Sequence, residues 1–224
     1  MRIEHYWGHS FLPDLIQPDG IVFDFGVYDG GFSRLVAPHC ARVIGFEPDP
    51  SRQYTSLPLP QNVRIITKAI AAKPGAMSFY VNSQLCSSLH YTEEQSKVVE
   101  VETVTFADAL ALEAESRIDL IKMDIEGEEV ELLRTAPPEL FTRVRQITVE
   151  FHDFLEPKSV PAIRAVIRRL QQLGFHAVKF SWNTFGDMLF VNQNLVLLSY
   201  WQRVWLRVHY KYVRGIIRVL GRFL

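Results

Sequence analysis

Short apolar runs and amphipathic stretches alternate along most of this 224-residue chain. Runs rich in β-branched and aromatic residues, which are typical of strands, occur at 21–24, 42–47, 63–67, 98–104, 117–127, 146–153 and 175–180. Segments with a helical pattern or composition lie between them at 32–36, 106–110, 128–136 and 161–173. This alternation predicts a doubly wound, mostly parallel α/β sheet that binds ligands at the carboxyl ends of its strands.

Weaker patterns predict the remaining elements. Residues 69–72 and 77–81, which flank the turn at 73–75, are expected to form a β-hairpin, and 188–191 and 195–198 to finish the sheet. Residues 1–20 are expected to form a short helix or lid. In that segment His5, Tyr6 and His9 are available to touch a substrate, although a partly buried packing segment is the favoured interpretation.

The stretch at 21–33, IVFDFGVYDGGFS, has the pattern of a strand, a tight turn and a helix start. Gly26 and Gly30 permit positive φ and a close approach of the backbone to a ligand. Asp24 at the strand end would repel a phosphate and attract an ammonium or sulfonium group. The spacing therefore favours S-adenosylmethionine over a dinucleotide, and a plain βα turn is the alternative.

An acid also ends the second predicted strand, because Glu47 follows residues 42–46 and lies seventeen residues after Gly30. In nucleotide-binding α/β sheets an acid at this place hydrogen-bonds the ribose hydroxyls. An exposed loop carboxylate is the alternative. Together with Asp24 and the two glycines, Glu47 indicates a donor site over the first two strand ends.

Two later strands end in alternating charged and polar residues. Lys122, Asp124 and Glu126 share one side of the stretch at 117–127, and Glu150 and His152 share one side of the stretch at 146–153. Burying charges is unfavourable unless they are paired, so these residues indicate a site rather than packing.

Their individual roles follow from their chemistry. His152 is the candidate general base, since an unperturbed histidine has a pKa near 6.5, and a core histidine is the alternative. Lys122 is expected to pair with Glu126 or Glu150. A divalent metal held by Asp124, Glu150 and His152 is a second alternative that is not favoured.

Composition and charge exclude few classes of function. Hydrophobic residues make up 48% of the chain and charged residues 22%, as in an ordinary globular protein, and the net charge of −1 suggests no nucleic-acid partner. Cys40 and Cys86 lack metal-like or CxxC spacing, which favours a reducing cytoplasm. The N-terminus lacks the apolar run of a signal peptide, and no apolar stretch approaches twenty residues.

The tail defines a second region, so we expect a domain at 1–198 and a basic amphipathic helix at 199–224. The tail contains no acid, and its basic residues recur at steps of three or four: Arg203, Arg207, Lys211, Arg214, Arg218 and Arg222. Trp201 and Trp205 lie near the opposite face, which suits peripheral contact with an anionic membrane. Packing on the domain and a homodimer seam are the alternatives.

The motif KMDIEGEE at 122–129 resembles the K-x-D-x-E-G-x-E signature of the FkbM-type methyltransferases. The segments FEP at 46–48 and EFH at 150–152 occur in the same order as in that family, and the resemblance covers roughly residues 18–180. It implies a class I methyltransferase fold, S-adenosylmethionine as donor, and transfer to a hydroxyl of a small molecule or a sugar.

With this resemblance, the candidate residues divide into two sets. The catalytic candidates are Asp124, His152, Lys122, Glu126 and Glu150. The donor-binding candidates are Asp24, Gly26, Gly30, Glu47 and Asp124. The polar loop at 82–97, with Ser87, Ser88 and His90, is expected to shape the acceptor pocket.

The first turn departs from the family pattern D-x-G-A-N-x-G, because Val27 and Tyr28 replace the small residue and the asparagine. Residues 105–108, TFAD, likewise lack one acid of the family's T-L-D-D. Tyr28 must point out of the pocket or reshape its floor, which keeps a degenerate binding module as an alternative. A nicotinamide oxidoreductase is the less favoured alternative, since the turn lacks G-x-G-x-x-G.

Overall fold

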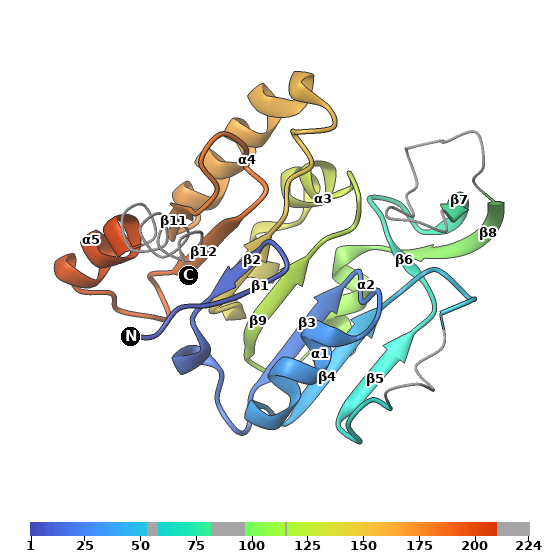
Figure 1. Ribbon diagram of the computed structural model, residues 1–224, viewed down its shortest axis with the longest axis horizontal. Coiled ribbons are helices and arrows are strands. Elements are labelled where there is room, and N and C mark those ends of the chain that lie inside the picture. The colour runs from blue at the N-terminus through green and yellow to red at the C-terminus, as the bar shows by residue number, and fades with distance from the viewer. Residues whose placement is uncertain (53–57, 82–96, 115, 210–224) are drawn as a thin grey trace, which may run out of the picture.

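The computed structural model describes residues 1–52, 58–81, 97–114 and 116–209, and a seven-stranded sheet forms its centre (Figure 1). The strand order is β11-β12-β10-β9-β3-β4-β5. The bounds are β3 (Ile21–Phe25), β4 (Arg42–Phe46), β5 (Val63–Ile66), β9 (Ile118–Met123), β10 (Gln146–Val149), β11 (Phe175–Lys179) and β12 (Met188–Asn192). Only β12 runs antiparallel to its neighbours in this sheet. The prediction of a mostly parallel α/β sheet is confirmed.

Helices cover both faces of the sheet. The α-helices are α1 (Gly31–Val36), α2 (Phe106–Ala111), α3 (Glu129–Thr135), α4 (Val160–Gln172) and α5 (Tyr200–His209). Short 3-10 helices occur at Pro13–Leu15, Ala37–His39, Pro138–Arg143 and Pro157–Ser159. Apolar side chains of α2, α3 and α4 form the largest core cluster with the strands, whereas α1 packs in a second cluster and α5 in a third. These layers leave the carboxyl ends of the parallel strands open for a site.

A second, three-stranded sheet corrects one prediction. Its strands are β6 (Ala69–Ile70), β7 (Gly75–Val81) and β8 (Lys97–Val104), in the order β6-β8-β7. The segments at 69–72 and 77–81 therefore form no hairpin, because β8 lies between β6 and β7. Thr103 pairs with Ala69 on one side and Gly75 on the other, and its hydroxyl donates to the carbonyl of Lys73 at 2.9 Å. The loop between β7 and β8, with Ser87, Ser88 and His90, lies outside the described residues.

The N-terminal segment begins with a β-hairpin that was not expected, and the expected short helix is limited to the 3-10 helix at Pro13–Leu15. Strands β1 (Glu4–Tyr6) and β2 (His9–Phe11) join through Trp7 and Gly8, whose φ angles of 43° and 85° match the left-handed turns of tight hairpins. Strand β2 is buried against β10 and β12 (Figure 1). The backbone and hydroxyl of Ser10 donate to Asp187 at 2.9 and 2.7 Å, which anchors the hairpin.

The C-terminal part also differs from its prediction. Residues 195–198 form no strand: the backbone N–H of Val196 turns back to the carbonyl of Asn192 at 2.9 Å, and the side chains of Val196 and Leu198 pack in one cluster with β11 and β12. Helix α5 follows and buries Leu206 in the same cluster, while Trp201 and Trp205 are exposed. The basic helix predicted beyond residue 209 lies outside the described residues. In the part of the chain that the structure covers, no helix is long and apolar enough to cross a membrane.

Candidate functional site

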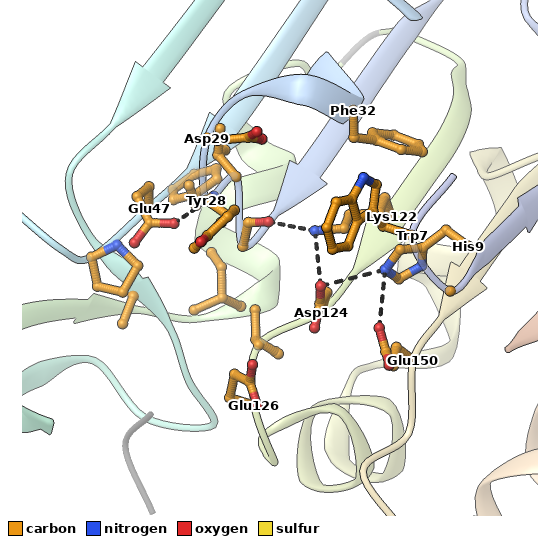
Figure 2. A pocket seen from close by; sticks show the side chains of 18 of the residues that line it. Trp7, His9, Tyr28, Asp29, Phe32, Glu47, Lys122, Asp124, Glu126 and Glu150 are labelled. Carbon is orange, nitrogen blue, oxygen red and sulfur yellow. Dashed lines mark hydrogen bonds and ion pairs between the residues drawn. The ribbon is translucent and has the colours of Figure 1, made fainter. Parts of the chain in front are cut away.

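A cavity of about 610 Å³ opens at the carboxyl ends of β3, β4 and β9 (Figure 2). The hairpin turn of residues 7–8 and the segment after β10 complete its wall. Of the candidate residues, those that line it are Gly26, Glu47, Lys122, Asp124, Glu126, Glu150 and His152. Asp24 and Gly30 are not among its lining residues. The strand ends chosen from the sequence therefore meet at one cavity.

Asp24 lies beneath the floor of this cavity and is completely buried. One carboxylate oxygen accepts a hydrogen bond from the hydroxyl of Ser33 at 2.7 Å, and the other lies 3.4 Å from Nζ of Lys122. Asp24 thus connects the end of β3 to helix α1 and to β9. A direct contact between Asp24 and a bound donor would require it to leave these partners.

Lys122 is buried between two carboxylates, which corrects its expected pairing. Its Nζ lies 3.4 Å from Asp24 and 3.4 Å from Asp124, and it donates a hydrogen bond to the backbone carbonyl of Gly26. Glu126 and Glu150, the partners expected from the sequence, are not within ion-pair distance of it. Burial alone would lower the pKa of Lys122, but Asp124 and Asp24 raise it above its ordinary value. Lys122 therefore carries a positive charge that orients Asp124.

Glu47 occupies the other end of the cavity and joins two turns. Its carboxylate accepts hydrogen bonds from the backbone N–H groups of Tyr28 at 2.8 Å and Asp49 at 3.0 Å. Burial raises its pKa, although these hydrogen bonds oppose the shift. Tyr28 adopts a φ of 54°, and the guanidinium of Arg52 lies 4.2 Å from the centre of its ring. The ring of Tyr28 lines the cavity beside Glu47 (Figure 2).

His152 is surrounded by acids. Its Nε2 lies 3.1 Å from Glu126 and 3.6 Å from Asp124, and its Nδ1 lies 3.2 Å from Glu129. Burial alone would lower the pKa of His152, but Glu129, Glu126 and Asp124 raise it to about 10. An imidazolium has no lone pair with which to accept a proton. The arrangement therefore does not suit the role of general base that the sequence suggested for His152.

His9 reaches the same end of the cavity from strand β2, and no motif marks it in the sequence. Its side chain is 1% exposed, and burial lowers its pKa. Nε2 lies 3.5 Å from Asp124 and 3.8 Å from Glu150, while Nδ1 lies 3.4 Å from the hydroxyl of Thr148. Burial and the nearby Asp124 raise the pKa of Glu150 to about 8. The segment considered a packing element thus supplies a side chain of the site.

The two ends of the cavity differ in character. Near Glu47 its wall is largely apolar, with Pro48, Ala69, Ile70 and Phe79. At the other end Asp124, Glu126 and Glu150 gather (Figure 2). Such a cavity suits an elongated ligand that has a flat ring and hydroxyls at one end and a cationic group at the other.

Comparisons with known proteins identify a family by sequence. The profile of the family described as the methyltransferase FkbM domain matches residues 24–177. The structure of methyltransferase FkbM from Methylobacillus flagellatus KT superposes with a TM-score of 0.47 and 14% identity, over 78% of this chain and 44% of that chain. This chain therefore spans less than half of that protein. An rRNA methylase from Streptococcus thermophilus superposes with a TM-score of 0.46 and 12% identity, over 80% and 88% of the two chains. The search of curated proteins found no match.

Proposed function

The chain belongs to the FkbM methyltransferase family, and from this premise we propose that it transfers a methyl group from S-adenosylmethionine to a hydroxyl of a small molecule or a glycan. The family match begins at the end of β3 and reaches into β11, so it includes the strand ends on which both ends of the cavity are built, but not the hairpin residues Trp7 and His9. The strand order with its one antiparallel strand is that of a class I methyltransferase.

The observation that carries the proposal is the two-ended cavity at the strand ends. In the proposed complex, the adenosine of the donor occupies the apolar end, where Glu47 accepts from the ribose hydroxyls. The sulfonium and ammonium groups face Asp124, whose charge Lys122 holds in place. Gly26 lines the cavity between these ends and leaves room for the methionine part.

Methyl transfer requires alignment above all. The oxygen–carbon bond to the acceptor forms while the carbon–sulfur bond of the sulfonium breaks, and the proton of the hydroxyl passes to water. Holding both reactants in line can supply roughly 7–11 kcal/mol of the barrier reduction. His152 is proposed to hold Glu126, and Lys122 to hold Asp124, so that both carboxylates keep their orientation.

The charges of the acceptor end support a neutral acceptor rich in hydroxyls. Asp124, Glu126 and Glu150 line this end and can accept hydrogen bonds from hydroxyl groups. The charges of Asp124 and Glu126 would repel the phosphates of a nucleic acid. This supports the small-molecule or glycan acceptor over RNA.

Binding of S-adenosylhomocysteine tests the proposal by calorimetry. Glu47→Gln should weaken binding by roughly 1–3 kcal/mol, because a hydrogen bond to a charged acceptor is lost. Glu139→Gln, on the exposed surface, is the matched control and should bind like the wild type. Equal affinities of wild type and Glu47→Gln would remove Glu47 from the donor site, and no binding by the wild type would overturn the donor assignment.

The two alternative functions give different outcomes in a thermal-shift experiment. A methyltransferase should be stabilised by S-adenosylmethionine and S-adenosylhomocysteine but not by NAD. Stabilisation by NAD alone would favour the oxidoreductase. A protein that responds to none of the three would favour a degenerate module.

A further inference from the structure

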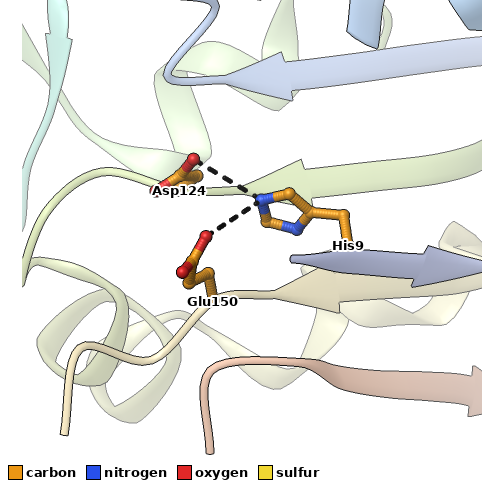
Figure 3. Close-up of side chains that lie close together, drawn as sticks. All are labelled: His9, Asp124 and Glu150. Carbon is orange, nitrogen blue, oxygen red and sulfur yellow. Dashed lines mark ion pairs between the residues drawn. The ribbon is translucent and has the colours of Figure 1, made fainter. Parts of the chain in front are cut away.

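Three side chains of metal-ligand type converge at the acceptor end of the cavity (Figure 3). His9 comes from β2, Asp124 follows β9 and Glu150 follows β10. One ligand atom of each lies within 4.8 Å of the others. These residues come from three separate parts of the chain, so the fold rather than local sequence brings them together.

The spacing of these atoms fits a cation between them. Nε2 of His9 lies 3.5 Å from Oδ2 of Asp124 and 3.8 Å from Oε2 of Glu150. Adjacent ligands of an octahedral ion with bonds of about 2.1–2.4 Å lie roughly 3.0–3.4 Å apart. The observed separations exceed hydrogen-bond lengths but need to shrink by only a few tenths of an ångström to enclose an ion.

The ring of His9 is oriented for this role. Nε2 is buried, points at the two carboxylates, and makes no hydrogen bond within the described residues. On its other side, Nδ1 contacts the hydroxyl of Thr148 at 3.4 Å. Metal-binding histidines commonly use the second ring nitrogen in this way, to a group that sets the tautomer and the ring orientation.

The local charges favour an additional cation. Lys122 is already shared between Asp24 and Asp124. Among the residues that the structure covers, Glu150 forms no salt bridge with a lysine or an arginine. The charge of Asp124 disfavours a second charge on the nearby carboxyl of Glu150, and a cation bound between these groups and the lone pair of His9 would remove that repulsion.

We propose that His9, Asp124 and Glu150 bind a divalent cation such as Mn²⁺ or Mg²⁺. Two carboxylates and one imidazole leave open coordination positions toward the cavity, where a hydroxyl of the acceptor can bind. Its role in catalysis rests on the proposed function, whereas its existence as a cation site does not.

A second group, Asp124, Glu126 and His152, has comparable spacing but a different character. Both ring nitrogens of His152 lie within 3.2 Å of a carboxylate oxygen, at ion-pair distance. The imidazolium thus already supplies the positive charge there. The metal set considered from the sequence, Asp124, Glu150 and His152, is therefore replaced by one that contains His9.

The cation would activate the acceptor. A hydroxyl bound to a divalent ion loses its proton to water more readily than a free hydroxyl does. The resulting oxygen forms its bond to the donor methyl as the carbon–sulfur bond breaks, and S-adenosylhomocysteine leaves. No oxidant or reductant takes part.

Titration with Mn²⁺, followed by the loss of the paramagnetic resonance signal of the free ion, tests the site without any turnover. The wild-type chain should bind one Mn²⁺, and His9→Gln and Glu150→Gln should each weaken binding at least tenfold. His39→Gln and Glu139→Gln, at exposed positions, are the matched controls and should bind like the wild type. Circular dichroism checks that each variant is folded. If one of the two ligand variants does not fold, the other still tests the site.

Three results would overturn the proposal. The first is no binding of Mn²⁺ by the wild type at concentrations up to about 1 mM, the weak end of known divalent sites. The second is that His9→Gln and Glu150→Gln both bind Mn²⁺ with wild-type affinity, or that only His152→Gln loses Mn²⁺ binding. The third is displacement of Mn²⁺ by saturating S-adenosylhomocysteine, which would make the donor itself the cation at this cluster. If the chain binds S-adenosylhomocysteine but no metal, the cation site is wrong and the proposed function stands. Failure of the cation site is therefore distinguishable from failure of the proposed function.

Discussion

Gly26 and Asp124 approach so closely that a Cβ atom on Gly26 would lie 1.8 Å from the backbone carbonyl oxygen of Asp124. Gly26 also adopts a φ of 82°, which a side chain would strain. The glycine expected from the sequence to permit ligand approach is therefore required by the contact between two chain segments as well. This contact fixes the distance between the strand ends that form the cavity.

Gly26→Ala should destabilise the fold by roughly 3 kcal/mol, because overpacking adds to the strained backbone. Urea denaturation measures the loss. Gly186→Ala is the matched control, since a Cβ atom at Gly186 would have its nearest neighbour at an ordinary 3.4 Å. A loss below about 1 kcal/mol in Gly26→Ala would show that Asp124 moves away easily.

Tyr28 occupies a left-handed position at φ 54°, where the family pattern has an asparagine. Asparagine tolerates this conformation, whereas an aromatic residue is strained by about 1 kcal/mol or more. Tyr28→Asn should therefore be at least as stable as the wild type, although it loses the contact with Arg52. Tyr28→Ala keeps the strain and loses the contact, so it should melt at a lower temperature. The reverse order in calorimetry would contradict this account.

His152→Gln should lower the free energy of unfolding by about 3–5 kcal/mol at pH 7, because it leaves a buried acid without its cation. The acid concerned is Glu129, whose carboxylate lies 3.2 Å from Nδ1 of His152. Chemical denaturation of the variant beside His39→Gln, an exposed control, provides the comparison. A change as small as that of the control would show that His152 is not an imidazolium.

Cys40 should be unreactive in the folded protein. Burial raises the pKa of its thiol to about 11, with Asp119 adding to the shift. In a Cys86→Ser background, labelling by a disulfide reagent at pH 8 should be about 100-fold slower in buffer than in urea. The native thiol keeps its proton at a pH where the unfolded one has lost it, so stability should fall as the pH rises from about 9 toward 11. Rapid labelling of the native chain would contradict the buried thiol.

Helix α5 has two exposed tryptophans through which the membrane hypothesis can be tested. Trp201 is 76% exposed and Trp205 47%, on the side away from buried Leu206. If these tryptophans contact lipid, Trp201→Ser combined with Trp205→Ser should reduce co-sedimentation with anionic liposomes at least tenfold. Trp182→Ser, another exposed tryptophan, is the control. Equal sedimentation of all three proteins, or insensitivity to salt, would end the membrane hypothesis.

The sheet and one half of the site follow from local patterns. Buried strands such as β4 and β9 show apolar runs, and the charged residues that follow them, Glu47 and Asp124, have few reasons to be there other than a site. The capping of α2 by Thr105 was predictable too, because Thr105 and Asp108 form a capping box within four residues.

Long-range placement was not predictable from these patterns. His9 enters the site because β2 docks on β10 and β12, and nothing near residue 9 encodes those partners. Similarly, Lys122 pairs with Asp24 and not with Glu126, although Glu126 is closer to it in the sequence. Strands β3 and β9 are adjacent and bring Asp24 opposite Lys122. Docking of the hairpin placed His9, and pairing between β3 and β9 placed Asp24 beside Lys122; alternation within one strand predicts neither contact.

The hairpin that carries His9 also limits the order in which parts of the chain can fold. Ser10 bonds to Asp187, which lies 177 residues later, and Leu12 to Gln146, which lies 134 residues later. During synthesis the hairpin must therefore wait for segments made much later before it can dock. Such contacts close the longest loops and form late in folding. The end of the cavity that contains His9 should therefore mature after the sheet, so a nascent chain would complete the end at Glu47 before the end at His9.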